Sequence, residues 1–382
     1  MKIAVLTWKL HNYGTALQAF ALVMYISKSS EYDCKLLNYS LPNKDKIDKV
    51  VPIRRIDLLR KSVNYITSKM NWLRNKKVKK YYRKDIDSQH TKFTKFYNMI
   101  PHDNHEVSLK ESYYFNSTYD KVIVGADQVW NPKYFCSTYF LDFVADDKKF
   151  SYAPSLGVST LKNEEKEYLK SKLSHFNMIS IREWTGKRIL EGIINKSVDW
   201  VVDPTLLFNK KQWDELLNLS DEEDEEYIFV YTLSAHHWYK NIINRIKEQL
   251  EFPKIIYVCT EDNLYFYEKE SNIYVNSGPI EFVKLLRNAR YIITDSFHGL
   301  CFSLIYEKYF TYLNRFDDSH IVRGENSRVI DLLNFLNIYD RFCKKNDKEA
   351  VCGKIYYEQI NKRLNILRNN SIQYISKILK DN

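Results

Sequence analysis

The sequence contains no apolar run long enough to cross a membrane as a helix. At the amino terminus the apolar residues 3–6 give way to polar ones at once, so the chain lacks the apolar core of a secretory signal peptide. We therefore expect a cytoplasmic location, either free or peripheral on the inner face of the plasma membrane.

Cysteine and glycine are sparse. The six cysteines show no Cys-x-x-Cys spacing, which argues against a zinc site and a disulfide framework, so the sequence predicts no metal and reduced thiols. The loop after the first apolar strand (2–7) holds only Gly14. This excludes the three-glycine fingerprint of dinucleotide-binding proteins.

Strand-like and helix-like segments alternate along the chain, as is typical of an α/β fold. A length of 382 residues suits two domains. We expect two Rossmann-like domains that face each other across a cleft. The first spans 1–203, and the second spans 204–345, after the Asp203-Pro204 pair stops regular structure. The last segment, 346–382, is expected to form a helix that packs back on the body.

A basic, amphipathic segment interrupts the first domain at about 44–112. Residues 44–95 contain seventeen Lys or Arg against five Asp or Glu, in a chain whose net charge is +10. Apolar and aromatic residues alternate with the basic ones at roughly helical spacing, as in helices that lie on anionic lipid. A helical hairpin that covers the core is the simpler alternative. No nucleic-acid-binding signature is present, so we expect no nucleic acid and an anionic membrane surface as the partner of residues 44–95.

Polar residues follow several expected strands. Asp127 comes after the strand that begins at Lys121, and Arg182 ends the strand at 178–181. The carboxyl ends of parallel strands meet at one edge of a sheet. A carboxylate there can orient or deprotonate a hydroxyl, and an arginine can bind a carboxylate or phosphate. The alternatives are a turn cap for Asp127 and an ion pair with Glu183 or another acid for Arg182.

Two helix starts carry further candidates. Ser296 is a good N-cap, so the first helical amides, His298 and Gly299 should form an anion site at the end of a strand. A capped helix with a packed histidine is the alternative. In the loop after the first strand, Gly14 allows close approach of a ligand, while Asn12 and Gln18 offer neutral hydrogen-bonding groups.

The chain resembles the polysaccharide pyruvyl transferase family in five motifs that follow the family order. They are Asn12-Tyr-Gly14-Thr-Ala-Leu-Gln18, Gly125-Ala-Asp127-Gln-Val-Trp130, Ser180-Ile-Arg182-Glu183, Asp203-Pro204-Thr205 and Asp295-Ser-Phe-His298-Gly299. Ala126 departs from the family, which commonly has Ser there. The segment 44–112 lies outside the resemblance.

The resemblance implies a fold similar to the GT-B glycosyltransferases. It also implies transfer of the enolpyruvyl unit of phosphoenolpyruvate onto two hydroxyls of a sugar, giving a cyclic ketal, with no other cofactor. Arg182 and His298 match donor-binding positions. A third basic residue is expected after the strand that follows His298, with Arg315 the first candidate and Arg323 the second.

Catalytic roles follow from the resemblance and the residue chemistry together. His298 is expected to donate a proton or stabilise the leaving phosphate. Asp127 is expected to act on the acceptor hydroxyl, beside Asn12, Gly14 and Gln18 on the acceptor side. The acceptor is expected to be a cell-surface polysaccharide or its lipid-linked precursor.

Two alternatives stay open at this point. One is a sugar-nucleotide glycosyltransferase of the same architecture, in which Glu325 is the acidic residue late in the second domain. The other is a non-catalytic, peripheral membrane protein of a polysaccharide assembly complex.

Overall fold

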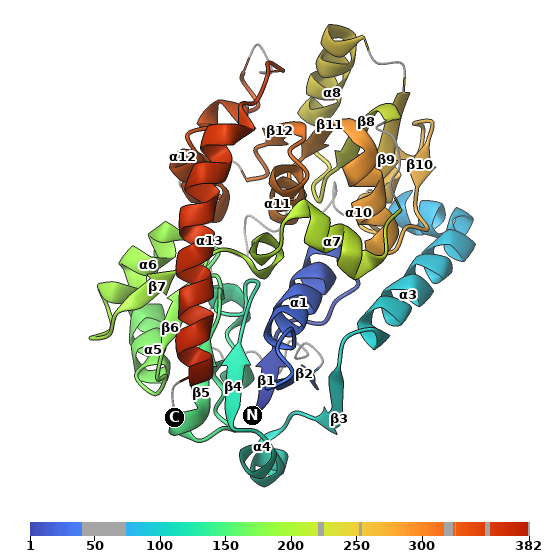
Figure 1. Cartoon of the computed structure of the whole chain (residues 1–382). Coiled ribbons are helices and arrows are strands. Elements are labelled where there is room, and N and C mark those ends of the chain that lie inside the picture. Colours follow the sequence, from blue (N-terminus) through green and yellow to red (C-terminus); the bar gives the residue numbers. More distant parts are fainter. Residues whose placement is uncertain are drawn as a thin grey trace, which may run out of the picture.

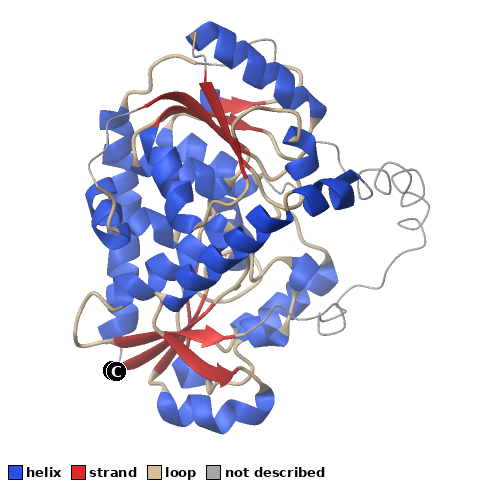
Figure 2. Cartoon of the chain, turned by 90° about the vertical axis from the view of Figure 1, so that its right-hand side faces the viewer, coloured by secondary structure: helices blue, strands red, loops and turns tan. Residues whose placement is uncertain are grey.

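Two parallel β-sheets form the two ends of the molecule in the computed structural model, with helices packed between and around them (Figure 1, Figure 2). The structure describes residues 1–39, 74–220, 225–251, 254–316, 324, 326–347 and 352–380. The predicted α/β fold with two Rossmann-like units is confirmed. Within the described part of the chain, no helix is both long and apolar enough to span a bilayer.

The first sheet has the strand order β3-β2-β1-β4-β5, with every neighbouring pair parallel. Its strands are β1 (Lys2–Leu6), β2 (Asp33–Asn38), β3 (His102–Glu106), β4 (Lys121–Val124) and β5 (Lys149–Ser151). A small parallel pair, β6 (Ile179–Ile181) and β7 (Val198–Trp200), continues beside β5 through one bridge. The helices of this half are α1 (Tyr13–Ile26), α3 (Arg83–Asn98), α4 (Ser112–Thr118), α5 (Asn163–Leu173) and α6 (Trp184–Glu191).

The second sheet has the order β10-β9-β8-β11-β12-β13, again parallel throughout. Its strands are β8 (Glu225–Tyr231), β9 (Lys254–Val258), β10 (Ile273–Tyr274), β11 (Ala289–Thr294), β12 (Tyr309–Leu313) and β13 (Phe342–Cys343). Its helices are α7 (Lys210–Leu217), α8 (His237–Leu250), α9 (Leu264–Tyr267), α10 (Pro279–Asn288), α11 (Phe297–Ile305) and α12 (Ser327–Leu336).

The central strands are buried over consecutive residues because helices cover both of their faces. All four residues of β4 are buried, and so are the last four of β11. This continuous burial distinguishes a central parallel strand from the alternating pattern of a half-exposed one.

The segment predicted as an insertion at 44–112 is in part a component of the sheet. β3 pairs with β2 and forms the outer strand, and α3 packs beside α1. The residues of β3 (HDNHE) are polar because it is an edge strand with a mostly exposed surface. For this reason no strand could be predicted there. Residues 40–73 lie outside the described part, and so does their predicted membrane role.

One hydrophobic cluster joins the two halves, in addition to a separate cluster in each half. Residues of the first sheet, the second sheet and α13 (Tyr357–Lys380) belong to the same buried cluster. At its centre Tyr13 of α1 stacks on Phe282 of α10, with ring centroids 4.5 Å apart. In Figure 1, α13 runs along one side of the molecule past both halves. This joint fixes the opposing walls of the cleft relative to each other.

Candidate active site

A cleft of about 510 Å³ lies between the carboxyl edges of the two sheets. Because every strand pairing is parallel, the loops after β1, β4, β6, β8, β9, β11 and β12 all reach it. The lining residues are Trp8, Leu10, His11, Asn12, Tyr13, Thr15, Gln89, Phe93, Asp127, Gln128, Arg182, Leu233, Thr260, Glu261, Asp262, Ser296, Phe297, His298, Arg315 and Arg328.

The start of α11 forms one wall. Ser296 has extended backbone angles, and its hydroxyl accepts a hydrogen bond from the Gly299 amide at 3.3 Å, so Ser296 is the N-cap. A Cβ at Gly299 would lie 2.4 Å from Thr294 Oγ1, so this glycine lets the helix pack on its own strand. The first-turn amides of Phe297 and His298 and the positive end of the helix dipole are left for an anion in the cleft.

His298 is held between the two halves. A Cβ added to Gly14 of α1 would lie 1.9 Å from His298 Nδ1, so only glycine leaves room for the imidazole. On the other side of the ring, Nε2 lies 3.4 Å from Asp203 Oδ2. This nitrogen makes no hydrogen bond within the described residues, so the contact is an ion-pair approach that leaves Nε2 able to bind a ligand.

Arg182 is the centre of a buried charge network. Its Nη1 donates to Asp203 at 2.8 Å and its Nη2 to Asp127 at 3.3 Å. Burial alone would lower the pKa of Arg182, but the two carboxylates raise it. Burial alone would likewise raise the pKa of Asp203, whereas His298 and Arg182 hold it well below its usual range. One arginine thus faces two carboxylates. The alternative of an ion pair with another acid is therefore confirmed, and the acids are Asp203 and Asp127 instead of Glu183.

Asp127 has little freedom to move. Its carboxylate accepts hydrogen bonds from Thr15 Oγ1 (2.8 Å) and the Gln128 amide (2.9 Å) besides Arg182. Gly125, two residues earlier, has φ of +127°, and a Cβ there would lie 2.0 Å from the Tyr152 carbonyl oxygen. The glycine therefore allows the sharp turn that brings Asp127 to the cleft.

Arg328 is a second buried arginine in the cleft. It makes no ion pair within the described residues, although the buried Glu183 carboxylate is near enough to raise its pKa. Its Nε and Nη1 make no hydrogen bond within the described residues. Burial and the nearby Arg182 guanidinium lower the pKa of Arg328 to about 10. Both guanidinium groups lie over the Phe297 ring, at 4.7 Å for Arg182 and 6.0 Å for Arg328. A buried, unpaired cation is costly unless an anion joins it.

Arg315 completes the cationic side. Its Nε donates to Ser234 Oγ at 3.3 Å, which places the guanidinium at the cleft. The Ser234 loop is held in turn by buried Asp295, which accepts from the amides of Leu233 (2.5 Å) and Ser234 (2.9 Å). Asp295 therefore fixes a neighbouring loop, while Ser296 alone caps α11.

The opposite wall joins α3 to the loop after β9. Glu261 is bound by His90 of α3 and by Lys79, whose Nζ lies 3.1 Å from Glu261 Oε2. The His11 ring lies 4.5 Å from the His90 ring, centroid to centroid. Because Glu261 and His11 line the cleft, this cluster connects the two halves at its rim.

Within the described residues, no group of three or more His, Cys, Asp or Glu is arranged to hold a metal ion. The titratable groups of the cleft are arginines, carboxylates and two histidines, and the arginines suit an anionic ligand.

Residues 12–318 match the polysaccharide pyruvyl transferase family. The chain belongs to this family. Membership makes it a transferase of polysaccharide biosynthesis, and the five motifs on which the resemblance rests all fall inside the matched range.

Solved structures outside the pyruvyl transferase family share its fold. UDP-GlcNAc 2-epimerase of Methanocaldococcus jannaschii is 13% identical with a TM-score of 0.53, and the match covers all of both chains. The Neisseria meningitidis UDP-GlcNAc 2-epimerase is 12% identical (TM-score 0.49, both chains fully covered), and the Escherichia coli heptosyltransferase WaaC is 11% identical (TM-score 0.38, 99% and 100% covered). At these identities the likeness concerns the fold alone. No curated protein matches the sequence.

The structure brings together six of the residues that the sequence placed in this pyruvyl transferase site. The residues that line the cleft are Asn12, Asp127, Arg182, Ser296, His298 and Arg315. Gly14 and Gly299 support the site from behind by close packing. Gln18 is fully buried, because its amide donates to Thr7 and accepts from the Ala126 amide, so it holds the turn before Asp127 and does not reach the cleft. Arg323 and Glu325 lie outside the described residues.

Three residues of the pyruvyl transferase site were not predicted in their roles. Asp203 was predicted as a turn residue and as part of a family motif, but not as the partner of Arg182 that it is. Buried Glu183 accepts from the amides of Leu156 (2.8 Å) and Gly157 (3.2 Å) and so shapes the loop after β5. Arg328 was not predicted. It lies in the first turn of α12, where a cation is unfavourable because the helix dipole is positive there. An arginine at such a position could have indicated an anion nearby.

Proposed function

We propose that this pyruvyl transferase uses phosphoenolpyruvate as donor. It moves the pyruvyl group onto two hydroxyls of a sugar residue in a cell-surface polysaccharide or its lipid-linked precursor, giving a pyruvate ketal. The observation that carries the proposal is buried Arg328 at the start of α12, whose Nε and Nη1 make no hydrogen bond within the described residues. A donor with a carboxylate and a phosphate supplies charged acceptors for these nitrogens.

The cationic wall suits both ends of this donor. Arg182 is neutralised by Asp127 and Asp203, so its role is to shape the site and hold Asp203 beside His298. Arg328, Arg315 and the first-turn amides of α11 remain for the two anionic groups. No further cofactor is required by this arrangement.

The reaction balances with the groups at hand. The methylene carbon of the donor gains a proton, one sugar hydroxyl adds to the central carbon, and the bond to the phosphate oxygen breaks. A neighbouring hydroxyl then closes the ring. The two hydroxyl groups release two protons in all. One balances the proton that the methylene carbon gains, and the other leaves with the phosphate. His298 is placed to transfer the first proton, and Asp127 to orient the acceptor hydroxyl.

The acceptor side is the wall opposite the arginines. Asn12 and Gln128 offer amides, Glu261 offers a carboxylate, and Trp8 offers an apolar ring face. A polyhydroxylated ring needs such a mixture of polar groups and apolar surface. We assign the acceptor sugar to this wall.

Calorimetric titration of phosphoenolpyruvate into the wild type, Arg328→Met and Arg290→Met tests the donor. Arg328→Met should weaken binding by about 10- to 100-fold, since a charge-assisted hydrogen bond contributes about 1.5–3 kcal/mol. Arg290 is exposed on β11, so Arg290→Met should bind as the wild type does. Arg328→Met should also melt no lower than the wild type, because it removes an unpaired buried cation.

Parallel titrations with nucleotide sugars address the glycosyltransferase alternative. Binding of a nucleotide sugar, with no binding of phosphoenolpyruvate to folded wild type, would favour that alternative. Unchanged phosphoenolpyruvate binding by Arg328→Met would place the donor elsewhere.

A further inference from the structure

A lysine face covers the outer side of the helical run that precedes and includes α3. Residues 74–81 are helical, and the Tyr82 amide bonds the Val78 carbonyl while the Ile86 amide bonds the Tyr82 carbonyl, both at 3.0 Å, so the run continues into α3. Lys77, Lys80, Tyr81 and Lys84, which we call the lysine face, have the spacing of one helix side and are all exposed.

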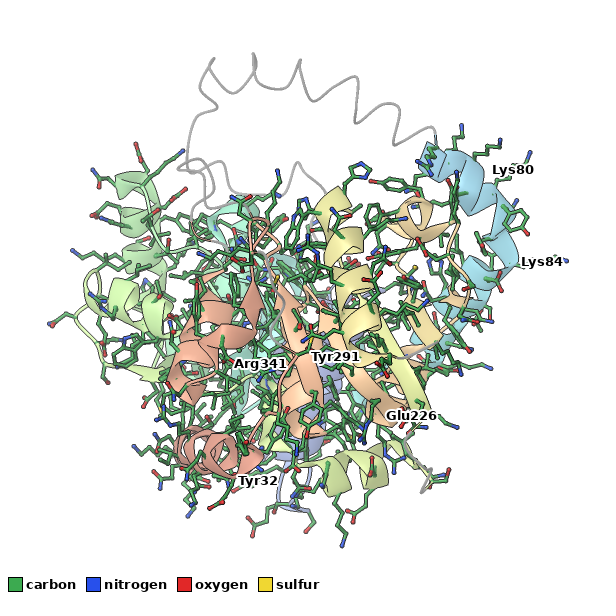
Figure 3. The ribbon with its side chains drawn as sticks, turned by 90° about the horizontal axis from the view of Figure 1, so that it is seen from above. Tyr32, Lys80, Lys84, Glu226, Tyr291 and Arg341 are labelled. Atoms are coloured by element: carbon green, nitrogen blue, oxygen red, sulfur yellow. The ribbon has the colours of Figure 1, made fainter. Side chains whose placement is uncertain are left out.

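Within the part of the chain that the structure describes, no acidic side chain pairs with the lysine face. Residues 74–84 contain seven Lys or Arg and no acid. Arg74 pairs with Glu268, and Lys79 with Glu261. Lys77, Lys80 and Lys84 make no ion pair within the described residues. Figure 3 shows Lys80 and Lys84 at the outer edge of the molecule, directed away from it.

The opposite side of the same run is fixed to the body. Val78 and Ile86 are buried in the core of the second half, and Phe93 is buried in the joint core. Further along the helix, Gln89 and Phe93 line the cleft. The lysine face is therefore rigidly mounted close to the cleft.

We propose that the lysine face docks on an anionic membrane surface. Lysines are compact point charges suited to a layer of lipid headgroups, whereas arginine forks are the usual choice for nucleic acid recognition. Tyr81, 82% exposed in the middle of the face, has the amphipathic ring typical of the membrane interface. Docking there brings the cleft close to the bilayer, where a lipid-linked saccharide would be presented. The docking itself does not depend on the donor, because the face lies outside the cleft.

Cosedimentation of the full chain with vesicles tests this proposal. We expect binding to vesicles that contain phosphatidylglycerol and none to pure phosphatidylcholine. The triple variant Lys77→Glu, Lys80→Glu, Lys84→Glu should bind the anionic vesicles at least about 100-fold more weakly, since each basic residue near the surface contributes about fivefold. Tyr81→Ala should weaken binding several-fold.

Matched control variants distinguish an effect of the lysine face from an effect of the net charge of the protein. Lys110, Lys170 and Lys377 are exposed on other elements, so changing all three to Glu alters the net charge equally. This triple variant should lose less than about tenfold, and Tyr113→Ala, at an 86% exposed tyrosine on α4, should lose nothing measurable. Circular dichroism verifies that each variant is folded.

Three results would overturn the proposal. They are absence of wild-type binding to anionic vesicles, equal losses in the two triple variants, and tighter binding of duplex RNA than of vesicles through the same three lysines at physiological salt. The last result would identify a nucleic-acid face.

Discussion

His298 and Gly14 show how single residues set this site. The imidazole comes from the second half of the molecule, and the space it occupies exists because residue 14, in the first half, has no side chain. Asp203, from the start of the connection between the halves, approaches the ring on another side. Three distant positions in the sequence therefore determine where the His298 ring lies.

Gly14→Ala should lower the rate of phosphate release from phosphoenolpyruvate by about 100-fold, because displacing a catalytic group by about 1 Å costs this much. Gly192→Ala is the control. A Cβ at Gly192 meets its nearest neighbours at an ordinary 3.4 Å, and this glycine is exposed at the end of α6. Steady-state kinetics and thermal melts of both variants provide the measurement. Full activity in Gly14→Ala would mean that His298 does not act where it lies.

At the scale of elements, α13 ties the halves together. Its buried residues recur every three or four positions, as in any amphipathic helix. Near its start, the Tyr357 hydroxyl donates to the Ser303 carbonyl of α11 at 3.3 Å. Near its end, the Tyr374 hydroxyl donates to the Ser151 carbonyl of β5 at 2.9 Å. α13 is thus hydrogen-bonded to α11 of the second half near its start and to the first sheet near its end.

Tyr374→Phe should reduce the free energy of unfolding by about 1 kcal/mol, the usual contribution of one hydrogen bond. The loss stays small because the Ser151 carbonyl also accepts from Ser180 Oγ. Tyr356→Phe, at a 77% exposed tyrosine just before α13, should change nothing measurable. Urea unfolding provides the comparison, and equal stability of both variants would show that this bond contributes nothing.

The molecule as a whole is joined at the cleft rim by His11, His90, Lys79 and Glu261. Burial and the neighbouring His90 lower the pKa of His11. For Glu261, burial alone would raise the pKa, but Lys79 and His90 lower it overall. A histidine with a lowered pKa binds fewer protons in the folded than in the unfolded chain, so its contribution to stability falls as the pH drops below about 6.5. A carboxylate with a lowered pKa loses its contribution only in more acidic solution.

Between pH 7.5 and pH 5.5 the wild type should therefore lose stability through His11. His11→Phe keeps a ring against Phe93 but cannot titrate, so its stability should fall less over this interval. His237→Phe, at an exposed histidine away from the rim, should follow the wild type. Unfolding curves at the two pH values give the answer. Identical pH dependence in wild type and His11→Phe would exclude His11 as the source.

The sequence by itself determined most of the elements and the motif residues at their ends. Apolar runs and capping residues are local features, and parallel topology then places Asp127, Arg182 and His298 at the two facing sheet edges. It could not show β3, whose polar residues carry no strand pattern. The sequence also could not show which charged side chains pair with each other.

Only the tertiary structure decided that Asp203 bonds Arg182 and that the Gln18 side chain is buried away from the cleft. It also decided that Arg328 lies in the cleft without an ion pair among the described residues. The physical reason is that pairing and burial depend on contacts between residues far apart in the chain. Arg182 and Asp203 are separated by 21 positions, and Gln18 and Ala126 by 108. No local pattern encodes such a contact, whereas packing the two halves against each other fixes all of them together.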